Sequence, residues 1–274
     1  MYGELEHNTQ LFEHYFRHYV GIAPEECPDR IVVTPAGFED LGGGDFQSMV
    51  GNMGWQVTPI MNIPGARFGR SFLIKKAGAR ILWSVGGIGA PYAFGHATLL
   101  SLTRSVRAVL FYGAAGGIGE EVKSYDINIP VSAICGAQVK EGWEPDVKEL
   151  TTDPRLSSLF ASRLRPELAQ WNRNVHLGHH YTTGHYFMET LSLLTHLKSV
   201  GILTIDLEFA VYASILRKAG VAVAGILRAS DLPLNDIAFH DSLEKKGVSK
   251  EQAAGVKHGI LTVVLSILQQ DISE

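Results

Sequence analysis

The chain has 274 residues, 46% of them hydrophobic, and a formal net charge of −4 at pH 7. This length and apolar content are sufficient for a substantial core and favour one large globular domain over two. The small negative charge provides no basic field for a polyanion, which excludes nucleic acid as an expected partner and favours a small-molecule ligand.

The cysteines and the N-terminal residues indicate the cellular compartment. Cys27 and Cys135 are the only cysteines, and their spacing fits neither a disulfide framework nor a zinc site. The first twenty residues mix Glu, His and Arg with apolar residues, a pattern typical of an amphipathic helix and not of a signal peptide. Apolar stretches such as 220–227 are shorter than the roughly 20 residues of a membrane-spanning helix. We therefore expect a cytoplasmic protein with no membrane segment, metal or cofactor.

The predicted elements alternate between strand and helix along the chain. We expect an N-terminal helical extension over residues 1–28 and one α/β domain over residues 29–274. Strands are predicted at 30–35, 71–75, 80–84, 108–112, 127–132, 178–182, 202–205 and 221–228. Helices are predicted at 91–103, 207–219 and 250–268, the last beginning with a capping box of Ser249 and Gln252. The polar stretch 143–171 is expected to be a surface excursion. This alternation predicts a three-layer α/β domain with helices on both faces of the sheet.

Two conspicuous segments are interpreted as structural. Three consecutive glycines at 42–44 precede no P-loop lysine and do not match the GxGxxG spacing, so a flexible loop is favoured over a phosphate-binding loop. A group of histidines lies in and around the predicted strand 178–182, and because successive side chains of a strand point to opposite faces, a shared zinc site is disfavoured. These histidines are His176, His179, His180 and His185.

Four short segments stand out by their order and spacing. They read Gly87-Ile88-Gly89-Ala90-Pro91, Gly113-Ala114-Ala115-Gly116-Gly117-Ile118, Asp206-Leu207-Glu208 and Ser230-Asp231. Together they resemble the nucleoside phosphorylase and nucleosidase family, which includes the hexamer-type purine and uridine phosphorylases, adenosylhomocysteine nucleosidases and AMP nucleosidases. The resemblance runs from about residue 30 to the C-terminus. It implies a mixed, partly barrel-closed central sheet with a nucleoside bound at the carboxyl ends of the strands.

Several residues are candidates for contacting the base. Glycines after a buried strand let the backbone approach a ligand closely, although a tight turn is the alternative explanation for Gly116 and its neighbour. The resemblance implies that Gly116 and Ser230 line the base site. It also places Tyr186 or Phe187 where relatives stack an aromatic ring on the base, whereas most such aromatic residues are buried in a core.

Glu208 is the candidate ribose ligand. It follows a predicted strand and opens a predicted helix, a position from which a carboxylate can accept hydrogen bonds from two vicinal hydroxyls. The resemblance implies that Glu208 binds the 2′- and 3′-hydroxyls, with Leu207 in place of the usual methionine and keeping its apolar packing. An ordinary carboxylate at a helix N-terminus is the alternative.

Asp231 is the candidate general acid. It follows the predicted strand 221–228 and stands beside Ser230. By the resemblance it protonates N7 of the departing purine, and a carboxyl whose pKa is raised by partial burial suits that task. In the family an aspartate at this position accompanies 6-aminopurines.

The positions that hold phosphate in the phosphorylases are changed in this chain. Those enzymes use a glycine and an arginine after the first strand, an arginine before the glycine-rich turn and a hydroxyl residue within it. The corresponding residues here are Ala36, Asp40, Phe111 and Ala114. Because an aspartate beside phosphate costs energy, water is favoured as the nucleophile. Glu39 or Asp40 would activate it, since adenosylhomocysteine nucleosidases carry glutamates in this loop.

Three residues stay as candidates for anion binding, namely Arg67, Gly37 and Ala114. Arg67 corresponds to the arginine that phosphorylases lend to the phosphate site of a neighbouring subunit. Binding of a nucleotide 5′-phosphate or a surface ion pair are the alternatives for Arg67.

We therefore predict hydrolysis of the N-glycosidic bond of a purine, and specifically a 6-aminopurine, nucleoside or nucleotide. A phosphate-dependent purine or uridine phosphorylase with an atypical anion site is the alternative enzyme. A non-catalytic nucleoside-binding protein is the alternative from another class. Because relatives complete each active site with residues of a neighbour, a homodimer or a trimer of dimers is expected.

Overall fold

One mixed sheet of ten strands organises the computed structural model, which describes residues 8–36, 45–60, 70–137 and 149–270. Along the sheet the strands run in the order β10-β6-β8-β9-β5-β1-β4-β3-β2, and β7 pairs with β6. The strands are β1 (Arg30–Thr34), β2 (Gln56–Ile60), β3 (Ser71–Lys76), β4 (Ala79–Val85), β5 (Ala108–Gly117), β6 (Ile127–Cys135), β7 (Glu149–Thr151), β8 (Val175–Thr182), β9 (Ile202–Asp206) and β10 (Ala222–Asp231).

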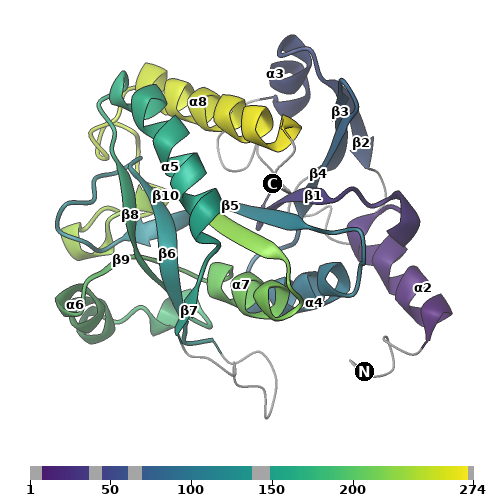
Figure 1. Cartoon of the computed structure of the whole chain (residues 1–274). Helices are drawn as coiled ribbons and strands as arrows, with labels where there is room; N and C mark the ends of the chain where they lie inside the picture. Colours follow the sequence, from purple (N-terminus) through teal and green to yellow (C-terminus); the bar gives the residue numbers. More distant parts are fainter. Residues whose placement is uncertain (1–7, 37–44, 61–69, 138–148, 271–274) are drawn as a thin grey trace.

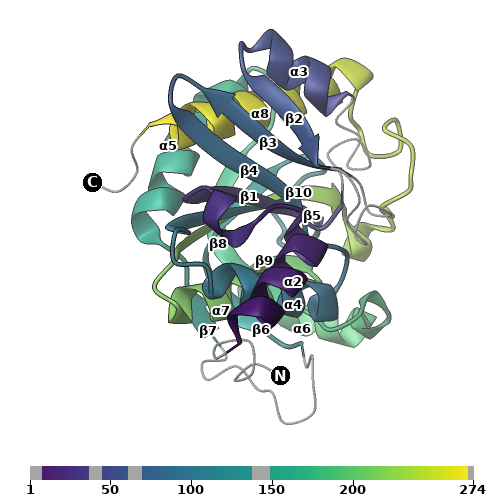
Figure 2. The same ribbon diagram turned by 90° about the vertical axis from the view of Figure 1, so that its right-hand side faces the viewer.

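Part of this sheet closes on itself. β10 pairs in parallel with β5 and antiparallel with β6, while β6, β8 and β9 pair in parallel and β9 returns antiparallel to β5. These pairings form a closed barrel of five strands. β1, β4, β3 and β2 extend from β5 as an open sheet that fans out beneath α3 in Figure 2. The predicted mixed and partly barrel-closed sheet is confirmed.

Helices cover both faces of the sheet, as predicted for a three-layer domain (Figure 1). α5 and α8 pack against each other on one face, and α4 packs against α7 on the other. The predicted capping box is present, because Ser249 and Gln252 each accept a hydrogen bond from the other's backbone N–H. The helices are α2 (Thr9–Val20), α3 (Phe46–Asn52), α4 (Ala90–Ser101), α5 (Pro154–Ala169), α6 (Leu191–Ser199), α7 (Phe209–Lys218) and α8 (Lys250–Gln269).

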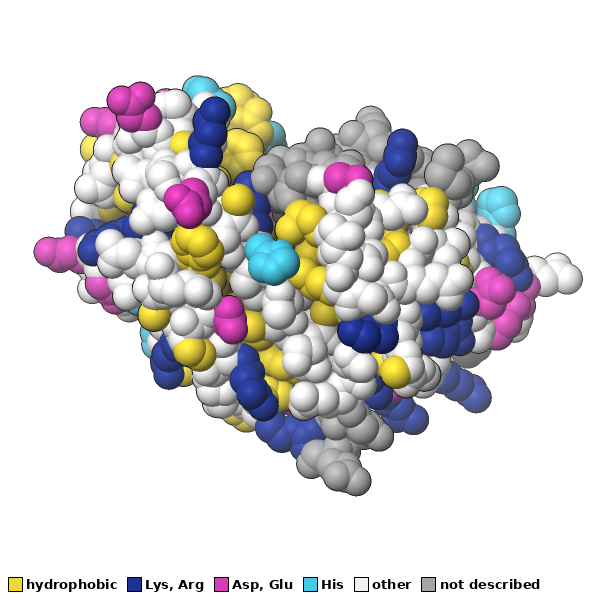
Figure 3. Space-filling view, turned by 90° about the horizontal axis from the view of Figure 1, so that it is seen from above, with side chains coloured by type: hydrophobic (Ala, Val, Ile, Leu, Met, Phe, Trp, Pro, Cys, Tyr) yellow, Lys and Arg dark blue, Asp and Glu magenta, His cyan; other side chains and the backbone are white. Residues whose placement is uncertain are grey.

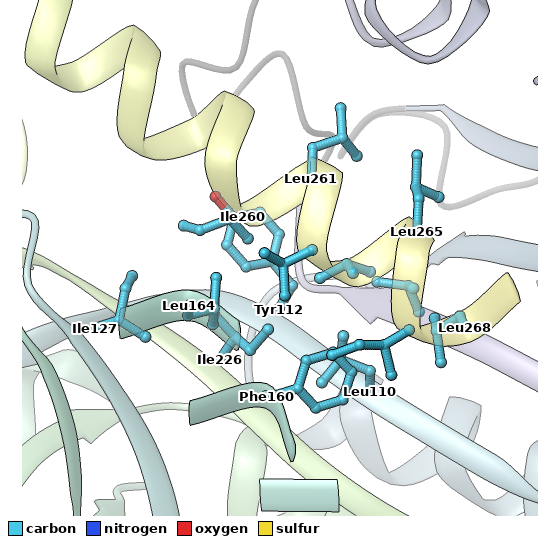
Figure 4. Packing of buried hydrophobic residues seen from close by; sticks show 14 of the residues in the cluster. Leu110, Tyr112, Ile127, Phe160, Leu164, Ile226, Ile260, Leu261, Leu265 and Leu268 are labelled. Atoms are coloured by element: carbon cyan, nitrogen blue, oxygen red, sulfur yellow. The ribbon is translucent and has the colours of Figure 1, made fainter. Parts of the chain in front are cut away.

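The two faces of the sheet bury separate hydrophobic clusters. On one side Leu110 and Tyr112 of β5 pack under Leu261 and Leu265 of α8, as Figure 4 shows. On the other side residues of α4 and α7 pack against the opposite face of β5, and α2 adds Phe16 to this cluster. Each helix thus buries one apolar stripe against the sheet.

β5 changes its neighbours along its length. Residues 108–111 pair with β1, whereas Gly116 and Gly117 pair with β9. β10 accompanies β5 on its other side from Ala108 to Gly116. The strands beside β5 therefore diverge towards its carboxyl end, and such a divergence is where open α/β sheets bind ligands.

Two predictions about local structure are wrong. The strand predicted at 108–112 continues as β5 to Gly117, so the glycine-rich segment belongs to the strand and does not follow it. The stretch 143–171, predicted as a surface excursion, contains β7 and α5 in its described part. α5 buries Phe160 and Leu164 completely, because its apolar residues recur every four positions and form one face of the helix.

None of the helices in the described part of the chain combines the length and apolar character that spanning a lipid bilayer requires. On the face seen from above in Figure 3, Lys and Arg side chains are interspersed with Asp, Glu and hydrophobic side chains. That mixture gives this face no continuous basic patch among its described residues.

Candidate active site

Gly116 lies between the ends of β9 and β10 and brings them together. It pairs with Ile205 on one side and with Asp231 on the other. A Cβ at Gly116 would lie 3.2 Å from Ile205 Cγ2 and 3.3 Å from Asp231 Oδ2. Because glycine has no side chain, a narrow space is left between the ends of β9 and β10. Its predicted contact with a base stays a prediction.

Glu208 is held at the first turn of α7 with only 4% of its surface exposed. Its Oε1 accepts a hydrogen bond of 2.6 Å from the backbone N–H of Gly89. Burial, with the charge of Asp206 as the second cause, raises the pKa of Glu208 to about 8. Two of the segments singled out in the sequence thus meet at this carboxyl.

The turn after β4 depends on glycine at two positions. Gly87 and Gly89 have φ angles of +91° and +96°, in the region that residues with a Cβ rarely adopt. Gly89 also precedes the first turn of α4, where a backbone N–H has no partner within the helix. The Glu208 carboxylate accepts a hydrogen bond from this N–H.

Asp206 fixes the backbone that carries Glu208. Its two carboxylate oxygens accept hydrogen bonds from the backbone N–H groups of Glu208, at 3.2 Å, and Phe209, at 2.9 Å. The Thr182 hydroxyl donates to Asp206 Oδ1 at 2.6 Å and accepts the N–H of Ala210 at 2.9 Å. The first N–H groups of α7 are therefore satisfied by side chains. Asp206 belongs to one of the four segments that stand out in the sequence, but its role was not predicted.

The histidines of β8 have separate partners. His180 is fully buried and bridges Asp206 Oδ1 and Thr204 Oγ1, at 2.9 Å from each. His176 contacts Asp126, and the exposed His179 contacts Ser132. Within the described ranges, no three His, Cys, Asp or Glu side chains are grouped as a metal site requires. His180 instead supports the carboxylate that fixes the start of α7.

Asp231 is the last residue of β10 and is half-buried. The buried Ser230 hydroxyl donates to its Oδ1 at 2.6 Å. Burial raises the pKa of Asp231, and the Ser230 hydrogen bond and the charges of Lys246 and Arg228 partly oppose that rise. A carboxyl with a raised pKa at a strand end has the properties that the prediction of a general acid requires.

Glu189 is a further carboxyl at this edge that was not predicted from the sequence. It follows the short 3₁₀ turn Tyr186–Met188 and is half-buried. Burial raises its pKa to about 7, with the charges of Asp231 and Asp206 as further causes. Glu189 follows no strand and belongs to no motif, so no sequence signal separated it from a surface glutamate.

The predicted base-stacking residues lie on the segment after β8. The side chains of Tyr186 and Phe187 are 57% and 77% exposed. Their ring centroids are 4.3 Å apart and the ring planes are tilted by 48°. They are therefore accessible to a ligand, and stacking on a base stays a prediction. Leu207 is half-buried beside Glu208, as expected for an apolar packing residue.

The predicted anion-binding and water-activating residues are only partly described. Gly37, Glu39, Asp40 and Arg67 lie outside the described residues. Ala114 is half-buried on β5. Two positions that correspond to phosphate-binding residues of the phosphorylases are apolar and buried, namely Ala36 and Phe111.

The sequence from residue 44 to residue 265 matches the model of the phosphorylase superfamily. The chain belongs to this family. It is an enzyme of the kind that acts on an N-glycosidic bond, as the predicted family resemblance implied. A curated relative is the DeoD-type purine nucleoside phosphorylase of Buchnera aphidicola subsp. Schizaphis graminum. It is 25% identical over 182 residues, which cover 65% of this chain and 71% of the relative.

Solved structures of the family share the fold. Uridine phosphorylase from Vibrio fischeri ES114 superposes with a TM-score of 0.69 at 15% identity, covering 95% of this chain and all of that one. AMP nucleosidase from Bacteroides thetaiotaomicron superposes with a TM-score of 0.63 at 16% identity, covering 94% of this chain and 98% of that one. At these identities the likeness establishes the architecture alone.

Proposed function

We propose that the protein hydrolyses the N-glycosidic bond of a 6-aminopurine nucleoside or nucleotide. The observation that carries this proposal is the presence of two carboxyls with different surroundings at one edge of the sheet. Glu208 is buried and held by a backbone N–H, whereas Asp231 is half-buried with a raised pKa. Two carboxyls whose surroundings differ can divide binding and acid catalysis between them.

In the proposed reaction Asp231 donates its proton to N7 of the purine as the C1′–N9 bond breaks. The bonding electrons leave with the base, and positive charge develops on the ribosyl ring. Glu208 accepts hydrogen bonds from the 2′- and 3′-hydroxyls, and its negative charge stabilises that cation. Water adds to C1′ and gives its proton to Glu39 or Asp40. Tyr186 or Phe187 stacks on the base, with Gly116 and Ser230 beside it.

Water is preferred to phosphate because the described anion positions offer no side-chain donors. Phe111 is fully buried and packs against Phe209 and Tyr212, with ring centroids 5.6 and 5.5 Å apart. Ala36 and Ala114 carry methyl groups. In this arrangement a bound phosphate would have to rely on backbone N–H groups, Gly37 or Arg67.

Incubation with adenosine, methylthioadenosine and AMP, with and without phosphate, tests this proposal. We expect free ribose or its 5′-substituted form as the product, at a rate independent of phosphate. Ribose 1-phosphate as the product would establish the phosphorylase alternative. Binding of the nucleoside without any base release would establish the non-catalytic alternative.

We further propose that the protein is a homodimer or a trimer of dimers. The support is the correspondence of Arg67 to a residue that phosphorylases share between subunits. Sedimentation at micromolar concentration measures the mass directly. A monomer there would contradict a shared active site.

A further inference from the structure

A buried chain of hydrogen bonds connects three elements beneath the proposed ribose site. His96 of α4 lies 3.0 Å from the Ser84 hydroxyl, through Nε2, and 2.9 Å from the Tyr212 hydroxyl, through Nδ1. All three side chains are at most 2% exposed. Burial lowers the pKa of His96 to about 4, so the ring is neutral at physiological pH. A neutral imidazole has one donor and one acceptor nitrogen, which allows it to bridge two hydroxyls.

The Tyr212 hydroxyl, at one end of this series of hydrogen bonds, lies directly against the turn after β4. A Cβ at Gly86 would lie 2.0 Å from the Tyr212 hydroxyl oxygen and 2.7 Å from His96 Nδ1. The Tyr212 hydroxyl and the His96 ring therefore occupy the space that a side chain at Gly86 would need. The N–H of Gly86 donates to the Thr34 carbonyl at 2.8 Å. Gly86 is therefore held by Thr34 on one side and by Tyr212 on the other.

Tyr212 is also coupled to Glu208. The two residues are one turn apart on α7, and the N–H of Tyr212 donates to the Glu208 carbonyl at 3.2 Å. At the other end of the turn that begins at Gly86, the N–H of Gly89 donates to the Glu208 carboxylate. The turn at 86–89, Tyr212 and Glu208 therefore contact one another where α4 packs against α7.

We propose that Ser84, His96 and Tyr212 are positioning residues that hold the turn at 86–89 against α7 and thereby fix the Glu208 carboxylate for two ribose hydroxyls. This inference rests on the proposed function, because it assumes that ribose is the ligand of Glu208. The three side chains touch no substrate. They act through the position of the Gly89 N–H.

Tyr212→Phe tests the proposal, because it removes one hydroxyl and keeps the ring. The probes are adenosine and 2′-deoxyadenosine, with binding measured by titration calorimetry and cleavage by base release. Loss of one buried hydrogen bond is expected to weaken adenosine binding roughly tenfold. Binding of 2′-deoxyadenosine, which lacks one of the two hydroxyls, should weaken less than about threefold. Ser84→Ala should have a smaller effect in the same direction.

A double-mutant cycle with Glu208→Gln distinguishes positioning from general destabilisation. If Tyr212 acts through Glu208, the Tyr212→Phe loss largely disappears in the Glu208→Gln background. The matched control is Thr103→Val, which removes a buried hydroxyl that donates to the Leu99 carbonyl at 2.9 Å, beyond the other end of α4. The control should lower thermal stability without changing the ratio of the two affinities. Equal losses for both nucleosides, or additive losses in the cycle, overturn the proposal.

The failure of the proposed function has a different signature. If the wild-type protein binds neither nucleoside, the function is wrong. The positioning role is then measured by hydrogen exchange of the Gly89 amide, which Tyr212→Phe should accelerate and Thr103→Val should not. An unchanged Gly89 exchange rate overturns the positioning role whatever the ligand is.

Discussion

Glu208 and Asp231 stand at the ends of β9 and β10, the two strands that flank the end of β5, but the structure holds them in different ways. Glu208 is 4% exposed, accepts a hydrogen bond from the Gly89 N–H and stands at the start of α7, which Asp206 and Thr182 secure. Asp231 is half-buried and accepts one hydroxyl, while Lys246 and Arg228 act on its charge. A carboxyl fixed in place suits binding, and one with access to solvent suits proton exchange. The difference assigns separate tasks to two residues of similar chemistry.

The largest effect should come from Asp231→Asn. The amide keeps a hydrogen bond to N7 but has no proton to give, so we expect kcat to fall by about 10²–10⁴-fold with nearly unchanged affinity. Steady-state rates and calorimetry on the same adenine nucleoside provide the comparison. Full activity of the variant would remove Asp231 as the acid and the mechanism with it.

Glu208→Gln should have an intermediate effect that extends to binding. A neutral amide accepts hydroxyl hydrogen bonds less strongly than a carboxylate, so kcat/KM for a ribonucleoside should fall roughly 10- to 100-fold, with weaker ground-state binding. The loss should be smaller for a 2′-deoxynucleoside. If Asp231→Asn and Glu208→Gln reduce rate and affinity in the same proportion, the two carboxyls do not have separate tasks.

Ribonucleoside affinity should depend on pH through Glu208. Its pKa is raised from 4.5 to about 8, so the free protein holds the proton below pH 8, whereas the hydroxyls bind the ionised form. Affinity should therefore rise with pH, by up to about tenfold per unit, and level off above pH 8. Calorimetric titrations at roughly one-unit steps between about pH 6 and 9 measure this dependence of affinity on pH. The dependence should disappear in Glu208→Gln, and its persistence there would assign the proton to another group.

The smallest effect is expected from Glu189→Gln. The charge of Asp231 is one cause of the raised pKa of Glu189, and because such repulsion acts on both carboxyls, removing the charge on Glu189 should lower the pKa of Asp231 slightly. Because the acid must be protonated, the high-pH limb of kcat should move to lower pH by less than about one unit. Glu167→Gln on α5, half-buried and hydrogen-bonded to Gln170, is the control that should leave the pH profile unchanged. A shift in the opposite direction would contradict the repulsion.

Local patterns in the sequence were sufficient for most elements and singled out Glu208 and Asp231, but not Glu189, at the candidate site. The β-branched run of β1 and the capping box of α8 are determined by neighbouring residues, and both are present. The glycines of β5 were misinterpreted, because glycine usually interrupts strands and only the flanking β9 and β10 keep this segment extended. α5 was missed because Pro166 and several charged residues obscured its apolar stripe.

Features that depend on distant residues could not be predicted. Closure of the barrel requires β10 to pair with both β5 and β6, and no local pattern encodes two partners. The hydrogen bond between Gly89 and Glu208 joins residues 119 positions apart in the chain. His96 and Tyr212 likewise resemble ordinary helix residues until the packing of α4 against α7 brings them together.

The change of neighbours along β5 also restricts how the length of this strand can vary among relatives. β1 pairs with it up to Phe111, and β9 first pairs with it at Gly116. One residue inserted or deleted between these positions would move Gly116 out of register with Ile205 and Asp231 and would turn the following side chains to the opposite face. Loops after other strands can lengthen without this penalty. Insertions and deletions between homologous chains should therefore accumulate in those loops, and the segment 112–115 should keep its length.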